Sequence, residues 1–366
     1  MRKFAFIIHP VVADDIARKF KFTASWSDDW KERFVRWMPP LKTSHITGIR
    51  SEHAEVEGYF IACPLTSRQL LGGVSVKKAT EKIIRAGRIA EKLGAEIVGL
   101  GALTSVVGDA GLTIAEQLNI GVTTGNSYTV ATALMASRLA AIKMGVNVAG
   151  ANVAIVGASG SIGQVCARLM AREAGSITLV ARNVDRLQQV AQRIKDETGV
   201  VARVSSDVRA SLAVADIVIT VTSSIDFVVD PLVLKPGAIV CDVARPRDVS
   251  EEVARLRDDI LIVDGGVVEV PGDVNFRFDF GFPPRMSYAC MAETMILTLE
   301  GKVSDFSLGR EISLGQVEEI TRLADKHGFK LAGFRTFERA VTDEKIAEIR
   351  SRAEANRKKA VIAGNS

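Results

Sequence analysis

The chain between residues 150 and 266 contains a succession of short apolar runs, and few folds can accommodate so many of them. The runs lie at 153–157, 177–182, 202–204, 216–222, 238–243 and 260–266. Segments with helical spacing separate these runs. A strand that is apolar on both faces is typical of a parallel sheet covered by helices. Alternation of such strands with helices predicts a Rossmann-like, doubly wound parallel α/β sheet.

The chain on either side of this sheet has a different pattern. Before it, a strand at 4–8 and a mixture of helical and strand patterns predict a second α/β domain, and after it the pattern is mainly helical. We therefore expect an N-terminal α/β substrate domain at 1–147 and a Rossmann dinucleotide-binding domain at 148–283. The C-terminal helices at 284–366 are expected to pack back on the N-terminal domain.

Composition excludes several classes of function. The net charge of +4 over 366 residues is too small and dispersed for a nucleic-acid-binding surface. Four separated cysteines and four histidines argue against a disulfide framework or a metal site. The apolar run after Phe4 is cut by His9-Pro10, which does not fit a signal peptide, and no run reaches the roughly 18 apolar residues of a membrane span. We expect a cytoplasmic protein, with transient contact with a membrane surface left open.

A glycine-rich segment, Gly-Ala-Ser-Gly-Ser-Ile-Gly at 157–163, follows the first predicted strand of the sheet and opens a helix. Glycines let the chain turn sharply and approach a pyrophosphate, which the N–H groups at the helix N-terminus then bind. A tight turn without a ligand is the alternative, but the flanking strand and helix favour a nucleotide site. The expected contacts are Gly157, Ser159, Gly160, Ser161, Ile162 and Gly163.

The end of the next strand indicates which dinucleotide binds. An NAD site usually has an acidic residue there, whereas this chain has Arg182 and Asn183, with Arg186 one turn later. An arginine can pair with a 2′-phosphate, so we expect NADPH as the cofactor, against the alternative of an arginine that faces solvent. Further cofactor contacts are expected at the carboxyl edge of the sheet, from Thr222, Ser223, Gly265 and Gly266.

Two of the four cysteines are expected in the core, since Cys166 lies inside a helix and Cys241 inside a buried strand. Cys63 lies at the end of a predicted strand, and for this cysteine both a core position and a functional role remain open. Cys290 lies in the first turns of a helix that begins near residue 285, and a helix N-terminus stabilises thiolate over thiol. From the residues alone, Cys290 is either a nucleophile or a core residue.

Several short motifs follow one another along residues 4–331, and their order is part of the signal. They are TTGNSYT (123–129), IVGASGSIG (155–163), LVARNVDRL (179–187), DGGVVE (264–269), YACMAETM (288–295) and FSLGREI (306–312). As a set they resemble the long-chain fatty acyl-[acyl carrier protein] reductases of the cyanobacterial type. Ser161 departs from the family's pattern, which has Asp there, and a charged helix after about 333 extends beyond it.

The resemblance implies that Cys290 carries a fatty acyl group as a thioester, that NADPH reduces it, and that a fatty aldehyde is released. It also implies an acyl carrier protein thioester as the partner and an acyl-binding role for 1–147. Because residues 20–45 depart from the cyanobacterial pattern, acyl-CoA remains an alternative donor.

The remaining catalytic groups are less defined. Ser105, Asn126 and Tyr128 are candidate oxyanion or proton donors for Cys290, together with Thr104 and Ser287. For any single Ser or Thr, a helix cap is the safer interpretation. The basic residues along 77–92 would suit an acidic carrier, or form a solvated helix face. Two rival functions are a shikimate-type or amino-acid dehydrogenase that uses a Lys–Asp pair, and a non-catalytic NADP-binding protein.

Overall fold

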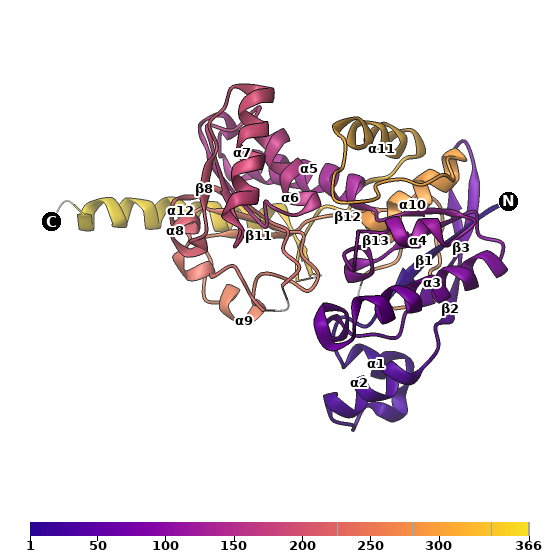
Figure 1. Ribbon diagram of the computed structural model, residues 1–366. Helices are drawn as coiled ribbons and strands as arrows, with labels where there is room; N and C mark the ends of the chain where they lie inside the picture. The colour runs from indigo at the N-terminus through magenta and orange to yellow at the C-terminus, as the bar shows by residue number, and fades with distance from the viewer. Residues whose placement is uncertain (225, 280–281, 338, 365–366) are drawn as a thin grey trace. The chain divides into compact units, whose positions relative to one another are not determined.

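The computed structural model describes residues 1–224, 226–279, 282–337 and 339–364 (Figure 1). The chain divides into two compact units. Unit 1 comprises Met1–Tyr128 and Val268–Lys330, and unit 2 comprises Thr129–Val267 and Leu331–Ser366. The three-part division expected from the sequence stays a prediction. In the structure the residues from 331 onward belong to the unit of the six-stranded sheet, whereas the three-part division groups them with 284–330.

Unit 1 is built on a five-stranded sheet with the order β2-β3-β1-β4-β5. Its strands are β1 (Arg2–Ile8), β2 (Leu41–Arg50), β3 (Glu55–Ala62), β4 (Ile97–Leu100) and β5 (Gly121–Thr123). All neighbours pair in parallel except β2, which runs antiparallel to β3. The carboxyl ends of β1, β3, β4 and β5 therefore lie at one edge of the sheet.

Two helices cover the faces of this sheet (Figure 1). Helix α3 (Val76–Lys92) packs on the face that carries Ala5 and Ile7. Helix α10 (Ala289–Glu300) packs on the other face, where Thr294 meets Gly99. Alternate strand residues point to opposite faces, so the apolar residues of β1 supply both cores.

The other elements of unit 1 lie mainly in its connections. They are α1 (Asp15–Lys19), α2 (Asp28–Trp37), the π-helical turn Gln69–Gly73, the 3₁₀ turn Ala102–Ser105, α4 (Leu112–Glu116), β13 (Met286–Tyr288) and α11 (Leu314–His327). Helix α5 (Asn126–Met144) begins in unit 1 and continues in unit 2, and the short strands β12 (Val267–Glu269) and β14 (Lys330–Leu331) lie at the other crossings.

Unit 2 contains a six-stranded, wholly parallel sheet with the order β8-β7-β6-β9-β10-β11. Its strands are β6 (Asn152–Val156), β7 (Ser176–Val180), β8 (Arg203–Ser205), β9 (Ile217–Thr220), β10 (Ile239–Asp242) and β11 (Leu261–Asp264). The predicted Rossmann-like fold is thereby confirmed, because the strand order reverses between β6 and β9 as in a doubly wound sheet.

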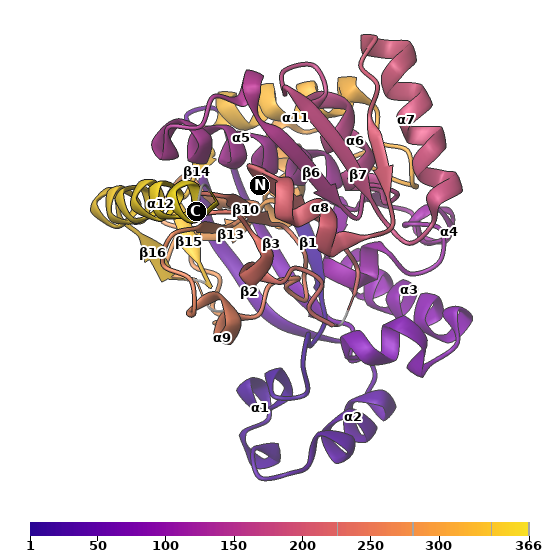
Figure 2. The same cartoon turned by 90° about the vertical axis from the view of Figure 1, so that its left-hand side faces the viewer.

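The helices of unit 2 follow its strands, as Figure 2 shows for β6 and β7 with α6 and α7. They are α6 (Ser161–Met170), α7 (Val184–Thr198), α8 (Val208–Val214), α9 (Glu251–Ala254) and α12 (Asp343–Gly364), and a hairpin of β15 (Phe334–Thr336) and β16 (Arg339–Val341) precedes α12. Within the described ranges, no helix is both long enough and apolar enough to cross a membrane.

Candidate active site

The four cysteines differ sharply in their surroundings. Cys63, Cys166 and Cys241 are fully buried, which confirms the core positions predicted for Cys166 and Cys241. Burial raises the pKa of both Cys63 and Cys241 to about 12, and it raises the pKa of Cys166 as well. These three thiols therefore keep their protons near neutral pH. Cys290 is only partly buried.

Cys290 is the second residue of α10, directly after β13. The N–H groups of a first helical turn have no partner within the helix, and the helix dipole adds positive charge there. A negative charge on the Cys290 sulfur is therefore better accommodated than it would be in the middle of the helix. The local basis is the N-cap at Tyr288, whose extended backbone ends the strand and starts the helix.

The backbone of Gly125 lies directly against Cys290. A Cβ atom at Gly125 would lie 2.3 Å from the Cα and 2.4 Å from the Cβ of Cys290. Gly125 also has a φ of +74°, which side-chain-bearing residues rarely adopt. This turn connects β5 to α5, so the TTGNSYT motif is brought to the cysteine by the end of the unit 1 sheet.

A buried carboxylate, Glu293, holds this turn in place. Its two oxygens accept hydrogen bonds from Thr123 Oγ1 at 2.5 Å and from the backbone N–H of Tyr128 at 2.7 Å. Burial raises the pKa of Glu293, and hydrogen bonds from Thr123, Tyr128, Ser307 and Gly125 oppose that rise. Glu293 was not among the predicted site residues, although an acidic residue within an otherwise apolar helix could have drawn attention to it.

The segment around Ser307 completes the support of the turn. Ser307 has a φ of +53°, and its carbonyl oxygen accepts a hydrogen bond from Thr124 Oγ1 at 2.5 Å. Its hydroxyl lies 2.6 Å from that of Ser127. Three motifs that are distant in sequence therefore meet here, at 123–129, 288–295 and 306–312.

The other predicted catalytic residues occupy different positions. Asn126 and Tyr128 are buried in the first turn of α5, next to Gly125 and Glu293. Burial raises the pKa of the Tyr128 hydroxyl, so it stays protonated at neutral pH. Ser105 instead donates its hydroxyl proton to the carbonyl oxygen of Ala102 at 2.6 Å, within its own turn after β4.

Thr104 and Ser287 also form local hydrogen bonds to the main chain. Thr104 Oγ1 donates to Gly101 O at 2.7 Å, and Ser287 Oγ donates to Tyr288 O at 3.2 Å. Neither bond is a helix cap, because a capping side chain accepts a hydrogen bond from a backbone N–H, whereas both of these hydroxyl groups donate to carbonyl oxygens.

His9, which was not predicted as a site residue, lies at the carboxyl end of β1. Its Nε2 accepts a hydrogen bond from Leu103 N at 3.2 Å, and its Nδ1 lies 2.9 Å from the carbonyl oxygen of Pro10. These partners require a neutral ring with the proton on Nδ1. Burial lowers the pKa of His9 to about 4, which keeps the ring neutral.

In unit 2, the predicted pyrophosphate loop has close backbone packing. A Cβ at Gly163 would lie 2.3 Å from Gly157 O, and one at Gly157 would lie 2.9 Å from Val221 O. Gly160 is the N-cap residue of α6, and Ser161 and Ile162 are its first two residues. Glycines thus bring the loop close to the first turn of α6, as binding of a dinucleotide at that turn requires.

The residues expected to select the cofactor follow β7. Arg182 is exposed and Arg186 is partly buried. Asn183 caps α7, and its Oδ1 accepts a hydrogen bond from Arg186 N at 3.0 Å. An arginine that reaches solvent at the end of this strand is able to pair with a 2′-phosphate.

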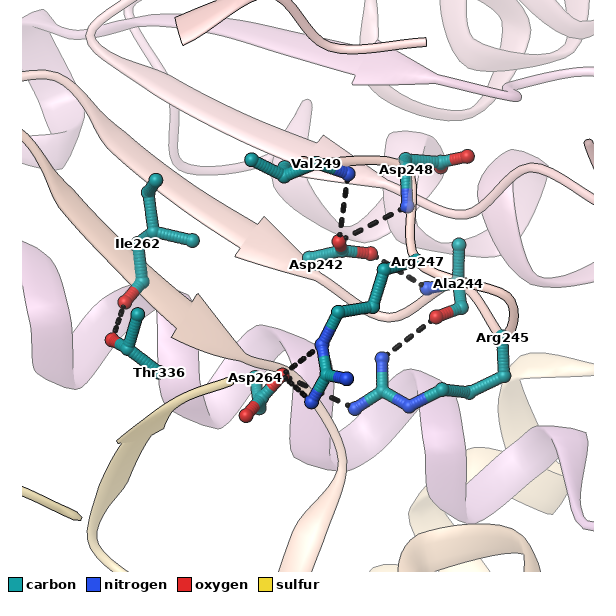
Figure 3. A network of polar contacts seen from close by, with 9 residues as sticks. All are labelled: Asp242, Ala244, Arg245, Arg247, Asp248, Val249, Ile262, Asp264 and Thr336. Carbon is teal, nitrogen blue, oxygen red and sulfur yellow. Dashed lines mark hydrogen bonds and ion pairs between the residues drawn. The ribbon is translucent and has the colours of Figure 1, made fainter. Parts of the chain in front are cut away.

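The loops after β9 and β10 are held by two buried aspartates that were not predicted. Asp248 accepts hydrogen bonds from Thr220 Oγ1 and Thr222 N, and from Thr222 Oγ1 at 2.5 Å. Asp242, at the end of β10, accepts from the backbone N–H groups of Ala244, Asp248 and Val249 (Figure 3). The hydroxyl of Thr222 is therefore engaged with Asp248, and Ser223 follows it in the same loop.

The two glycines after β11 serve close packing and a turn. A Cβ at Gly265 would lie 2.6 Å from Val243 Cγ2, and Gly266 has a φ of +77°. Next to them, Asp264 pairs with Arg247 at 3.0 Å and with Arg245 at 3.3 Å (Figure 3). Hydrogen bonds and ion pairs therefore connect the polar side chains at the carboxyl edge of the sheet of unit 2.

The chain is similar to several known proteins. Residues 138–264 match the shikimate/quinate 5-dehydrogenase family. The long-chain acyl-[acyl-carrier-protein] reductase of Synechococcus elongatus is 29% identical over 334 residues, which cover 87% of this chain and 94% of that protein. Aminotransferase PigE of a Serratia species is 30% identical over 328 residues, or 88% of this chain, but the match spans only 37% of PigE.

Among solved structures, glutamyl-tRNA reductase of Methanopyrus kandleri aligns with 80% of this chain and 60% of its own, at 18% identity and a TM-score of 0.30. The family and sequence matches support an oxidoreductase with a nicotinamide-binding domain. The resemblance inferred from the motifs is confirmed: over most of its length this chain is similar to a long-chain acyl-[acyl-carrier-protein] reductase.

Proposed function

We propose that this protein is an NADPH-dependent reductase that takes a long-chain fatty acyl group from a thioester onto Cys290 and releases it as a fatty aldehyde. The observation that carries the proposal is the position of Cys290. It is the partly exposed cysteine, at a helix N-terminus and against the Gly125 turn, while burial keeps Cys63, Cys166 and Cys241 protonated.

In the first step, the Cys290 sulfur attacks the carbonyl carbon of the donor thioester. A new carbon–sulfur bond forms at Cys290, the carbon–sulfur bond of the donor breaks, and the donor thiol leaves with the proton that Cys290 gave up. One thioester replaces another, so the main barrier lies in the negative charge that develops on the carbonyl oxygen. The first-turn N–H groups of α10 and the side chain of Asn126 are our candidates to stabilise that charge.

Asn126 is a candidate by its position in the turn that lies against Cys290, whereas the Ser105 hydroxyl donates to Ala102 O within its own turn. Tyr128 keeps its proton at neutral pH and is our candidate proton donor when the aldehyde is released. Both residues belong to the turn that Glu293 holds against α10.

The cofactor supplies a hydride when bound, which reduces the acyl carbon to the aldehyde level. The residues of unit 2 fit a dinucleotide. The glycines of the loop at 157–163 bring the chain close to the first turn of α6, where N–H groups can bind a pyrophosphate. We assign the 2′-phosphate to Arg182, with Arg186 beside it.

Replacement of the arginine tests this assignment. Arg182→Ala should weaken NADPH binding by roughly 10-fold or more, the loss expected for a charge-assisted hydrogen bond, and leave NADH binding unchanged. Arg203→Ala, an exposed position at the start of β8, is the matched control. Fluorescence titration measures both affinities, and an equal change for NADPH and NADH would contradict the assignment.

Intact-protein mass spectrometry tests the covalent step. Wild type, Cys290→Ser and the control Cys63→Ala are mixed with palmitoyl-CoA or a palmitoylated carrier protein in the absence of cofactor. We expect one added acyl group on wild type and on Cys63→Ala, none on Cys290→Ser, and discharge of the adduct by NADPH. Absence of an adduct on wild type with either donor would reject the acyl-enzyme and favour a dehydrogenase without a covalent intermediate.

A further inference from the structure

A groove of about 640 Å³ lies in unit 1 between α2 and the beginning of α3. Helix α2 contributes Arg33, Arg36 and Trp37, and α3 contributes Lys78 and Lys82. The volume is within the range of small-molecule sites, roughly 300–1,000 Å³. None of these residues belongs to the cysteine site or the dinucleotide loop.

The groove carries an excess of positive charge. Its acidic lining residues are Asp29 and Glu32, and Glu32 accepts a hydrogen bond from Thr66 Oγ1 at 3.2 Å. Among the residues that the structure describes, Arg33, Arg36 and Lys78 have no carboxylate within ion-pair distance. Arg33 lies over the ring of Trp30, with its Cζ 5.7 Å from the ring centroid, and this contact leaves its charge unneutralised. The charges of all three cations can therefore attract an anion that enters the groove.

Lys82 has a different role, because it fixes the shape of the groove. Its ammonium group donates to the carbonyl oxygens of Arg36 at 2.9 Å, Pro64 at 3.1 Å and Val35 at 3.4 Å. It thus ties the end of α2 to the segment after β3. Both ribbon views show α2 beside the start of α3 (Figures 1 and 2).

The groove lies at the same edge of the sheet as Cys290. Leu65 and Gln69, which line it, follow the carboxyl end of β3, and Gly125, which contacts Cys290, follows the carboxyl end of β5. Both strands point the same way, and ligands of such sheets bind at the carboxyl edge.

We propose that this groove binds the phosphate-bearing part of the thioester donor, and so positions the thioester for transfer to Cys290. The proposal rests on the proposed function. A fatty chain has no charge for Arg33, Arg36 and Lys78 to recognise, whereas a phosphopantetheine thioester carries phosphate, which guanidinium groups bind through paired hydrogen bonds. Trp37, 83% exposed beside the cations, offers a face on which an aromatic base could stack.

Phosphate beside pantetheine occurs in both coenzyme A and the prosthetic group of a carrier protein, so the test uses donors that separate the two sources. Acylation of Cys290 is measured with palmitoyl-CoA, with S-palmitoyl-4′-phosphopantetheine and with S-palmitoyl-N-acetylcysteamine, which has no phosphate. The variants are Arg36→Ala and Lys78→Ala, both at exposed positions where the fold tolerates change. Arg88→Ala, exposed on α3 outside the groove, is the control.

We expect each variant to lower the second-order rate of acylation by palmitoyl-CoA about 10- to 100-fold and to leave the N-acetylcysteamine thioester unaffected. Loss with palmitoyl-CoA alone assigns the groove to the 3′-phosphoadenosine part, and loss with phosphopantetheine as well assigns it to the phosphate beside pantetheine. Equal effects on all three donors, or no effect on any, would overturn the proposal.

A calorimetric titration with coenzyme A itself separates this proposal from the proposed function. Wild type should bind coenzyme A, and Arg36→Ala should bind it about 10-fold more weakly or worse, whether or not Cys290 becomes acylated. Failure of all three donors to acylate wild type would reject the acyl-enzyme. Equal binding of coenzyme A by wild type and variant would reject the groove.

Discussion

Replacement of Gly125 by alanine tests the arrangement of the cysteine site directly. The new Cβ would lie 2.3 Å from the Cα of Cys290, where ordinary contacts begin at 3.4 Å, so the backbone of Cys290 must retreat by roughly 1 Å. The positive φ of +74° adds about 1–2 kcal/mol of conformational cost. Overpacking adds about 1–3 kcal/mol.

Gly199→Ala is the matched control for this substitution. Gly199 has a φ of +75°, and a Cβ there would meet nothing within 4 Å. The control therefore has the conformational cost without the steric conflict. We expect Gly125→Ala to unfold at a lower temperature than Gly199→Ala, by about 2–4 °C for each kcal/mol of difference. Thermal denaturation followed by circular dichroism measures the difference.

The same pair should differ in reactivity. Displacement of a reacting group by about 1 Å can cost on the order of 100-fold in rate, so Gly125→Ala should transfer palmitoyl groups to Cys290 that much more slowly. Gly199→Ala should stay within about twofold of wild type. Equal melting temperatures and equal acylation rates for the two variants would refute the close contact between Gly125 and Cys290.

Two further predictions concern buried titratable groups. Glu293→Gln places an amide N–H₂ where a carboxylate oxygen accepts a hydrogen bond, so it should lower the free energy of unfolding by about 1–3 kcal/mol, as measured by denaturant titration. The control Glu318→Gln, at an exposed position, should leave that free energy unchanged. Equal stabilities of the two variants would contradict the hydrogen bonds of Glu293. The pKa of His9 is lower in the folded protein, about 4, than in the unfolded chain, so the unfolded state takes up a proton first as the pH falls. Stability should therefore fall by up to about 3 kcal/mol between pH 6.5 and 4 in wild type, more than in His9→Gln, and parallel pH profiles would contradict the neutral, partly buried ring.

The sequence by itself was sufficient for the sheet of unit 2 and for the position of the glycine-rich loop after β6. Strands buried on both faces must be apolar at consecutive positions, so β6 and β9–β11 can be recognised without knowledge of their neighbours. The constraint on Gly163 is equally local, because the carbonyl oxygen of Gly157 leaves no room for a Cβ there, whereas the space at Gly157 is limited by Val221 from a distant segment. Cys166 and Cys241 were placed in the core because each lies within a predicted helix or buried strand.

The polar contacts of the candidate site in each unit depended on tertiary structure. Glu293 reaches Thr123 across 170 residues of sequence, and Asp248 reaches Thr220 across 28, so no local pattern reveals either contact. The hydroxyl group of Ser105 looked available in the sequence, and only the folded turn shows that it donates to Ala102.

The same distinction applies to the groove and to the end of the chain. The basic residues of α2 and α3 lie in two segments that are far apart in the sequence, and the three hydrogen bonds of Lys82 connect the end of α2 to α3. The sequence led us to expect that the helices of 284–366 pack back on the N-terminal domain, and contacts in the structure assign the part from Leu331 onward to unit 2. Periodicity along a chain records which face of an element is buried, whereas the identity of the group that covers it is decided only when distant segments pack against each other.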